Sequence, residues 1–294
     1  MTAALQTIPP RMPSRPEWAL PAGACDCHTH VFGPYERFPL IHPTPYAPPL
    51  APADVHRAML TQIGASRGVL VQPGAFGSDP SAIVAALRDA GGHLRGVAAS
   101  TSEVSDRELD TWHEAGIRAL RFNEMPAPSG SGRYPGSIGI DELDRLAPRL
   151  ATRGWHAEVW ARLDTHVALL PRLRGFGISV VLDHMAGLVA SHGIAHPDFQ
   201  AILHALQEGW LWVKLTLCRC SGDYPDYQEL RPFHDALIAA NPDRVVWGSD
   251  WPYVRLGDKT PDVAHVLSLF RDWVPNESLR HRILVTNPAR LYGF

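Results

Sequence analysis

Three histidines and an aspartate stand at the ends of apolar stretches in this 294-residue chain. His28 and His30 are two residues apart, so on a β-strand both imidazoles point to the same face. His184 comes shortly after the apolar stretch 180–182, and Asp250 ends a stretch that begins at residue 245. Imidazole and carboxylate side chains can transfer protons or bind a divalent metal. The sequence therefore predicts that these four side chains form one catalytic site.

Eight short apolar stretches, which we expect to be strands, alternate with eight segments of helical spacing. The strands are predicted at 24–30, 68–72, 96–100, 117–122, 157–160, 179–183, 211–216 and 245–250, and the helices at 52–63, 80–90, 105–115, 141–153, 164–175, 197–208, 227–240 and 261–273. Continuous apolar stretches are typical of parallel strands covered on both faces. Ser105 and Glu108 add a capping-box pattern at the start of the third helix.

This alternation predicts an α/β fold, a slightly distorted (β/α)8 TIM barrel. An open doubly wound sheet is the alternative, but it would normally carry a glycine-rich phosphate loop where this chain has His-Thr-His. In a barrel the ends of the strands meet at one rim, which would bring the four side chains together. The loop 126–139 follows the fourth strand on that rim, and it is either a lid or a plain flexible loop.

The composition is that of a globular protein with a large core, because 45% of the residues are hydrophobic and 19% are charged. The formal net charge of -3 and the scattered basic residues give no reason to expect binding to nucleic acid. No stretch approaches the roughly 18 apolar residues of a membrane span, and the start lacks the apolar centre of a signal peptide. We expect a cytoplasmic protein that binds no membrane, with a proline-rich N-terminal arm over residues 1–21 and a single barrel domain over residues 22–294.

The four cysteines form two close pairs, Cys25 with Cys27 and Cys218 with Cys220. Structural zinc sites usually place about two to four residues between paired cysteines, and here there is one. We therefore expect free thiols in a reducing compartment rather than a zinc site or disulfides.

Four motifs carry a resemblance to a known family. They are Asp-Cys-His-Thr-His-Val-Phe-Gly-Pro from Asp26, Leu-Asp-His-Met-Ala-Gly from Leu182, Trp-Gly-Ser-Asp-Trp-Pro from Trp247 and Thr-Asn-Pro-Ala-Arg-Leu-Tyr from Thr286. In this order they resemble the amidohydrolase superfamily, in its 2-pyrone-4,6-dicarboxylate lactonase-like branch. The resemblance implies a hydrolase that opens a small carboxylated lactone. Pyrone dicarboxylates, muconolactone-type intermediates of aromatic compound degradation and sugar-acid lactones all remain open as substrates.

The resemblance also implies roles for the four side chains. Asp250 would act as the general base that activates a water molecule, and His28, His30 and His184 would polarise the lactone carbonyl and stabilise the oxyanion.

Arginines are the natural readers of substrate carboxylates, because a guanidinium can donate two parallel hydrogen bonds. Arg121 ends the fourth predicted strand, Arg219 lies just past the seventh, and both are expected to bind the substrate. Ala127 stands where the lactonase-like branch carries another arginine, so either Arg133 takes over or the substrate has one carboxylate fewer. Further substrate-binding candidates are Tyr46, Gln72 and Trp160.

No cofactor is favoured, because Trp160 stands where metal-binding relatives would have a ligand histidine. Zinc or another divalent metal remains an alternative, held by His28, His30 and Asp250 with His184 or Glu158. The competing functions are a zinc-dependent hydrolase or decarboxylase of the same superfamily and, less favoured, a non-catalytic binding barrel. The sequence does not indicate an oligomeric state.

Overall fold

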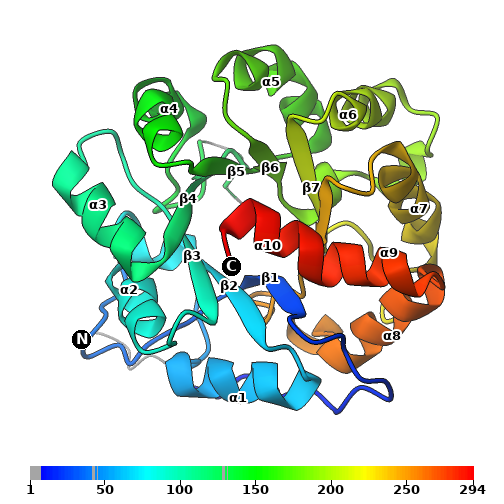
Figure 1. Ribbon diagram of the computed structural model, residues 1–294, viewed down its shortest axis with the longest axis horizontal. Coiled ribbons are helices and arrows are strands. Elements are labelled where there is room, and N and C mark those ends of the chain that lie inside the picture. Colours follow the sequence, from blue (N-terminus) through cyan, green and yellow to red (C-terminus); the bar gives the residue numbers. More distant parts are fainter. Residues whose placement is uncertain (1–7, 42–43, 45, 128–129, 131) are drawn as a thin grey trace.

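The computed structural model describes residues 8–41, 44, 46–127, 130 and 132–294, and in this part of the chain eight parallel strands form a barrel (Figure 1). Each strand pairs with the next one along the chain. Trp251, just beyond the last strand, forms a parallel bridge with Thr29 of the first and closes the barrel. The strands are β1 (Cys25–Thr29), β2 (Arg67–Val71), β3 (Leu94–Ala98), β4 (Ile117–Asn123), β5 (His156–Trp160), β6 (Val180–Leu182), β7 (Leu211–Leu215) and β8 (Val245–Trp247).

Helices surround the barrel and cover the outer faces of the strands (Figure 1). They are α1 (Ala53–Ile63), α2 (Ser81–Arg88), α3 (Asp106–Ala115), α4 (Leu143–Thr152), α5 (Leu163–Gly175), α6 (Pro197–Gln207), α7 (Arg231–Ala240), α8 (Val263–Trp273), α9 (Glu277–His281) and α10 (Asn287–Tyr292). The predicted (β/α)8 barrel is confirmed. The capping box of α3 is present, with the Ser105 hydroxyl accepting from the Glu108 amide.

Two strands end earlier than predicted, and a residue in the left-handed conformation lies within three residues of each end. The strand predicted to reach Asp250 ends at Trp247, and the one predicted to reach residue 183 ends at Leu182. Asp250 has φ 73° and His184 has φ 49°, left-handed values that no strand contains. Non-glycine residues in this conformation cost about 1–3 kcal/mol and cluster at functional sites.

The two C-terminal helices were missed by the sequence analysis and close the end of the barrel at which the strands begin. Figure 1 shows α10 lying across this end. The buried Tyr292 hydroxyl donates to Glu158 Oε1 at 2.8 Å, inside the barrel. The Asn287 amide donates to the carbonyls of Pro242 and Val245, both at 2.8 Å, and so attaches the segment to the start of β8.

The N-terminal residues that the structure describes lie against the loop after β8. The Trp251 indole donates to the Arg11 carbonyl at 3.2 Å, and the Ser14 amide donates to Asp262 Oδ1 at 3.0 Å. The division into an arm and one barrel domain stays a prediction, and residues 1–7 of the arm lie outside the described part.

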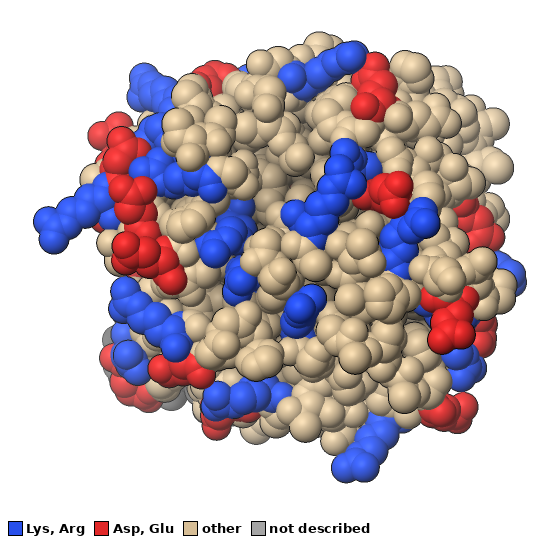
Figure 2. Space-filling model, viewed as in Figure 1, with Lys and Arg blue, Asp and Glu red and all other residues tan. Residues whose placement is uncertain are grey.

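The described residues contain no helix that is both long and apolar enough to cross a membrane. Figure 2, which looks at the α10 side, shows basic side chains separated by uncharged ones near the centre and acidic side chains mainly toward the edge. The four cysteines are free thiols, as expected.

Gly248 permits the close approach of the last strand to the first. A Cβ at this position would lie 2.7 Å from His28 Cβ and 3.0 Å from the His28 amide nitrogen. Only glycine therefore fits the seam that carries the site histidines.

We expect Gly248→Ala to lower the free energy of unfolding by about 1–3 kcal/mol, because the added methyl overpacks a rigid seam. Gly175→Ala is the matched control, since a Cβ there meets nothing within 4 Å. It should be neutral or slightly stabilising in a helix. Urea unfolding of both variants checks this, and equal stabilities would refute the steric role of Gly248.

Candidate active site

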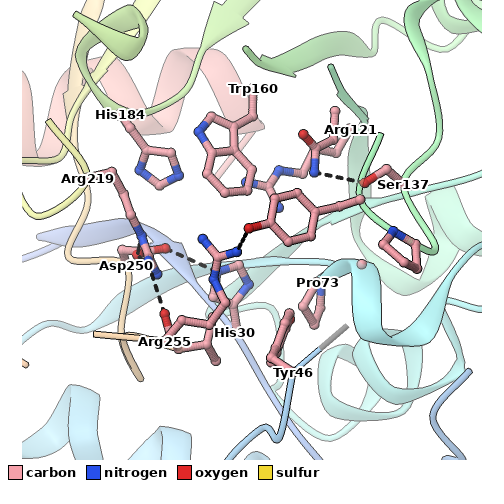
Figure 3. Close-up of a pocket in the computed structure, with 15 residues that line it drawn as sticks. His30, Tyr46, Pro73, Arg121, Ser137, Trp160, His184, Arg219, Asp250 and Arg255 are labelled. Carbon is pink, nitrogen blue, oxygen red and sulfur yellow. Dashed lines mark hydrogen bonds and ion pairs between the residues drawn. The ribbon is translucent and has the colours of Figure 1, made fainter. Parts of the chain in front are cut away.

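The structure brings the four predicted side chains together at the rim where the strands end (Figure 3). The ring of His28 lies 5.1 Å from that of His30 and 4.8 Å from that of His184, measured between centroids. Asp250 Oδ1 is 3.2 Å from His30 Nε2 and 3.6 Å from His28 Nε2. All four are buried. His30, His184 and Asp250 line a pocket, and His28 lies beneath them.

Backbone hydrogen bonds across the seam fix these side chains. The Asp250 amide donates to the His28 carbonyl at 2.8 Å, and the His30 amide donates to the Trp251 carbonyl at 2.9 Å. Asp26, which the sequence analysis did not single out, accepts from the amides of His28 and Ser249 through Oδ1. Burial raises the pKa of Asp26 to about 6. This carboxyl therefore holds the first and last strands in register.

Asp250 is held as a carboxylate by Arg219. The Arg219 Nε and Nη2 atoms lie 2.7 Å and 2.6 Å from Asp250 Oδ2. Burial alone would raise the pKa of Asp250, but the Arg219 guanidinium and the hydrogen bond from His30 hold it well below its usual range. Because both arginine contacts go to Oδ2, Oδ1 stays directed at the histidines and is the oxygen placed to take a proton.

The site histidines differ in how their ring nitrogens are used. Burial lowers the pKa of His184 to about 4 and that of His28 well below its ordinary value, so both are neutral near pH 7. The Lys214 ammonium lies 3.1 Å from His28 Nδ1 and can only donate. The same nitrogen lies 3.3 Å from Asp183 Oδ1, a slightly longer contact. The nearer ammonium favours an accepting Nδ1 and a proton on Nε2, on the Asp250 side. His30 Nδ1 lies 2.7 Å from the Val71 carbonyl and must donate to it, which leaves Nε2 facing Asp250.

A buried ion cluster lies directly below the histidines. Lys214 Nζ is 2.5 Å from Glu158 Oε2 and 3.2 Å from Asp183 Oδ1, and Arg121 Nε is 3.0 Å from Asp183 Oδ2. The nearby carboxylates raise the pKa of Lys214 even though burial opposes this. Burial would raise the pKa of both carboxyls, but Lys214 lowers it. The sequence analysis missed Lys214, although a lysine inside the apolar stretch 211–215 was a signal.

Among the residues that the structure describes, two groups of donor atoms could surround a metal ion, with all donors of a group within 4.8 Å of one another. In the group of His28, Glu158 and Asp183, the Lys214 ammonium already occupies the space for a cation. The group of His28, His184 and Asp250 offers two imidazoles and a carboxylate, a donor set that suits zinc. His28 Nε2 and His184 Nδ1 also have no hydrogen-bond partner among the described residues. This second group fits a divalent metal if His28 carries its proton on Nδ1 instead, where Asp183 Oδ1 lies 3.3 Å away and can accept it.

The predicted substrate-binding residues are only partly brought to the pocket. Arg121, Arg219, Tyr46 and Trp160 all line it. Figure 3 shows Arg121 and Trp160 across the pocket from Asp250 and Arg219. The Arg121 guanidinium lies over the Trp160 ring, 5.3 Å from its centroid. Burial raises the pKa of the Tyr46 phenol, which therefore stays neutral.

Gln72 and Arg133 were predicted to reach the substrate, and the structure places both elsewhere. The Gln72 amide donates to the carbonyls of Gly77 and Asp79 and accepts from the Ala99 amide, so it holds the loop after β2. Arg133 donates to Glu124 at 2.8 Å, outside the residues that line the pocket. The pocket instead contains side chains that the sequence analysis missed, namely Asn123, Tyr134, Ser137 and Arg255.

We expect Lys214→Met to lower the free energy of unfolding by about 3–5 kcal/mol, because it leaves buried carboxylates without their cation. The chain has one other lysine, the exposed Lys259, and Lys259→Met is the matched control. Denaturant unfolding should separate the two variants clearly. A Lys214→Met protein as stable as the control would show that the cluster does not need this charge.

Acid should weaken the fold well above the pH at which carboxylates titrate. Burial lowers the pKa of His56 to about 3 and that of His184 to about 4, whereas unfolded histidine titrates near 6.5. Below pH 6.5 the unfolded state binds protons that the folded state excludes, so stability is lost as pH falls. Each such histidine contributes about 1 kcal/mol of loss between pH 7.5 and 5.5. Asp26, with its pKa raised to about 6, offsets part of this.

Unfolding measured at both pH values checks the sign. His56→Gln should reduce the loss by about one histidine's share, while the exposed His204→Gln should leave it unchanged. A stability that is equal at the two pH values would contradict the neutral, buried state of these rings.

Comparison with known proteins identifies the family. The chain is 33% identical over 290 residues to a 2-pyrone-4,6-dicarboxylate hydrolase of Comamonas testosteroni, covering 95% of this chain and 93% of that one. It is 32% identical to a 4-sulfomuconolactone hydrolase of Rhizobium radiobacter, covering 97% and 95%. A solved probable 2-pyrone-4,6-dicarboxylic acid hydrolase of Acinetobacter baumannii, with citric acid bound, superposes with a TM-score of 0.79 at 25% identity, covering 92% and 100%. The amidohydrolase family model matches residues 25–294, and the chain therefore belongs to the amidohydrolase family.

Proposed function

We propose that this protein is a lactonase that hydrolyses a small carboxylated lactone with an Asp250-activated water. The observation that carries the proposal is the arrangement at the pocket: an ionised Asp250 lies beside the neutral His28 and His184, and arginines line the same space. The similarity to hydrolases of a pyrone dicarboxylate and a sulfomuconolactone supports the choice of a cyclic ester with acidic substituents.

In the first step the oxygen of a water molecule attacks the lactone carbonyl carbon, and Asp250 Oδ1 accepts a proton from that water. The C=O bond becomes a C–O⁻ bond of a tetrahedral intermediate. His28 carries its proton on Nε2 and His184 lines the pocket, so these rings are placed to donate to the new oxyanion. Donors fixed in advance in a dry site supply several kcal/mol of barrier reduction.

In the second step the intermediate collapses and the ring C–O bond breaks. The proton held on Asp250 passes to the departing ring oxygen, which leaves a hydroxyl, while the former carbonyl carbon becomes a carboxylic acid. Arg219 keeps Asp250 in place through both transfers. This ion pair makes Asp250 a weak base. It also keeps Asp250 fully ionised at neutral pH, so in all of the enzyme the carboxylate is in the form that can accept a proton.

The second candidate is a zinc-dependent hydrolase or decarboxylase, favoured by the donor set of His28, His184 and Asp250. A divalent metal held there would lower the pKa of a bound water. The roles of Arg121, Arg219 and Trp160 around the substrate would be the same in both cases.

We expect Asp250→Asn to lower kcat by about 10²–10⁴-fold, because the amide cannot accept the water proton. The measurement is hydrolysis of a panel containing a pyrone dicarboxylate, a muconolactone and a sugar-acid lactone. Asp258→Asn, exposed in the same loop, is the matched control and should keep full activity. Full activity in Asp250→Asn would refute the assignment of the base.

Elemental analysis of the same preparations separates the two candidates. Hydrolysis by protein that holds no metal, unchanged by a chelator, supports the proposed mechanism. Activity that is lost with bound zinc and restored by adding zinc supports the metal-dependent alternative.

A further inference from the structure

Arg255 differs from the other arginines at the pocket in having no acidic partner among the described residues. Arg121 is paired with Asp183, and Arg219 is paired with Asp250. The described contacts of the Arg255 guanidinium are with Tyr134, whose hydroxyl accepts a hydrogen bond from Nη1 and whose ring centroid lies 4.6 Å away. Neither contact neutralises a charge.

Among the arginines at the pocket and the lysine below it, Arg255 is the one whose charge no described carboxylate balances. Below the pocket, the positive charges of Lys214 and Arg121 match the negative charges of Glu158 and Asp183. Beside it, Arg219 and Asp250 cancel. An anion that enters the pocket is therefore attracted mainly toward Arg255.

Arg255 lines the pocket in which the substrate would bind. It follows β8, whereas Tyr134 belongs to the loop after β4, so the pair joins loops from opposite sides of the barrel. Figure 3 shows Arg255 reaching across the pocket in front of His30 and Asp250. Its backbone has φ 68°, a left-handed conformation that arginine rarely adopts, so the loop is folded into an unfavourable shape that holds this side chain at the mouth.

We propose that Arg255, supported by Tyr134, binds an acidic substituent of the substrate at the mouth of the pocket, and that the enzyme therefore prefers lactones with two acidic groups. This inference rests on the proposed lactonase function. The inner group would meet Arg121 beside Trp160, and the outer group would meet Arg255. Arg133, the loop arginine expected from the sequence, cannot serve because Glu124 holds it.

The first test measures binding without catalysis. Isothermal titration at low salt with citrate, a tricarboxylate, compares wild type with Arg255→Gln, Arg255→Lys and the control Arg133→Gln. We expect Arg255→Gln to weaken citrate binding by about tenfold or more, since a charge-assisted hydrogen bond is lost. Arg255→Lys should lose less, because it keeps the charge but not the planar fork. Arg133→Gln should stay within twofold.

The second test uses the same variants with two lactones that share a ring and differ by one carboxylate. Arg255→Gln should raise KM for the dicarboxylate about tenfold and leave its kcat nearly unchanged, so that the preference over the monocarboxylate disappears. Loss of kcat without a change in KM would count against an anchoring role.

The outcomes distinguish this inference from the proposed function. Citrate affinity that does not depend on Arg255, or a wild type that binds no citrate, overturns the inference even if Asp250-dependent lactone hydrolysis is found. Arg255-dependent citrate binding in a protein that hydrolyses no lactone would keep the anion site and overturn the lactonase proposal.

Discussion

Lys214 places a positive charge inside the barrel, where burying an isolated ion would cost several kcal/mol. The barrel can hold it only because Glu158 and Asp183 lie within hydrogen-bonding distance and Arg121 balances the second carboxylate. This cluster lies below the site histidines, and its ammonium favours the tautomer of His28 that carries the proton on Nε2. The same few side chains therefore balance the buried charge and influence which nitrogen of His28 is protonated.

Buried charges are also paired among the reacting groups, which lie above this cluster. Arg219 pairs with Asp250 Oδ2 and leaves Oδ1 directed at the histidines, and burial keeps His28 and His184 uncharged by lowering the pKa of each. A neutral imidazole beside a carboxylate can donate a hydrogen bond without needing a counterion of its own. The site thus presents a proton acceptor and hydrogen-bond donors close together, and Arg219 balances the charge of the carboxylate, which limits the cost of burying it.

The strand ends position the reacting side chains, whereas the loops form the outer wall that would recognise the substrate. The four reacting side chains are positioned by strand ends that backbone hydrogen bonds hold in register, including those to Asp26. The outer wall comes from loops after β4 and β8, which contribute Tyr134 and Arg255. Loops tolerate replacement better than a closed barrel does, so relatives with the same reacting groups can accept different acidic lactones by changing these loops.

The sequence by itself determined the barrel and the convergence of its reacting groups. Apolar stretches alternated with helical segments, and the polar residues at strand ends can meet at only one rim. The left-handed turns at His184 and Asp250, the ion cluster around Lys214 and the choice of Arg255 over Arg133 depended on the tertiary structure. Arg133 is nearer to Arg121 along the chain, but its position follows from Glu124, and Arg255 meets Tyr134 across 121 residues of sequence. Periodicity reports the local path of a strand or helix, whereas charge pairing and loop geometry depend on residues brought together only when the barrel closes.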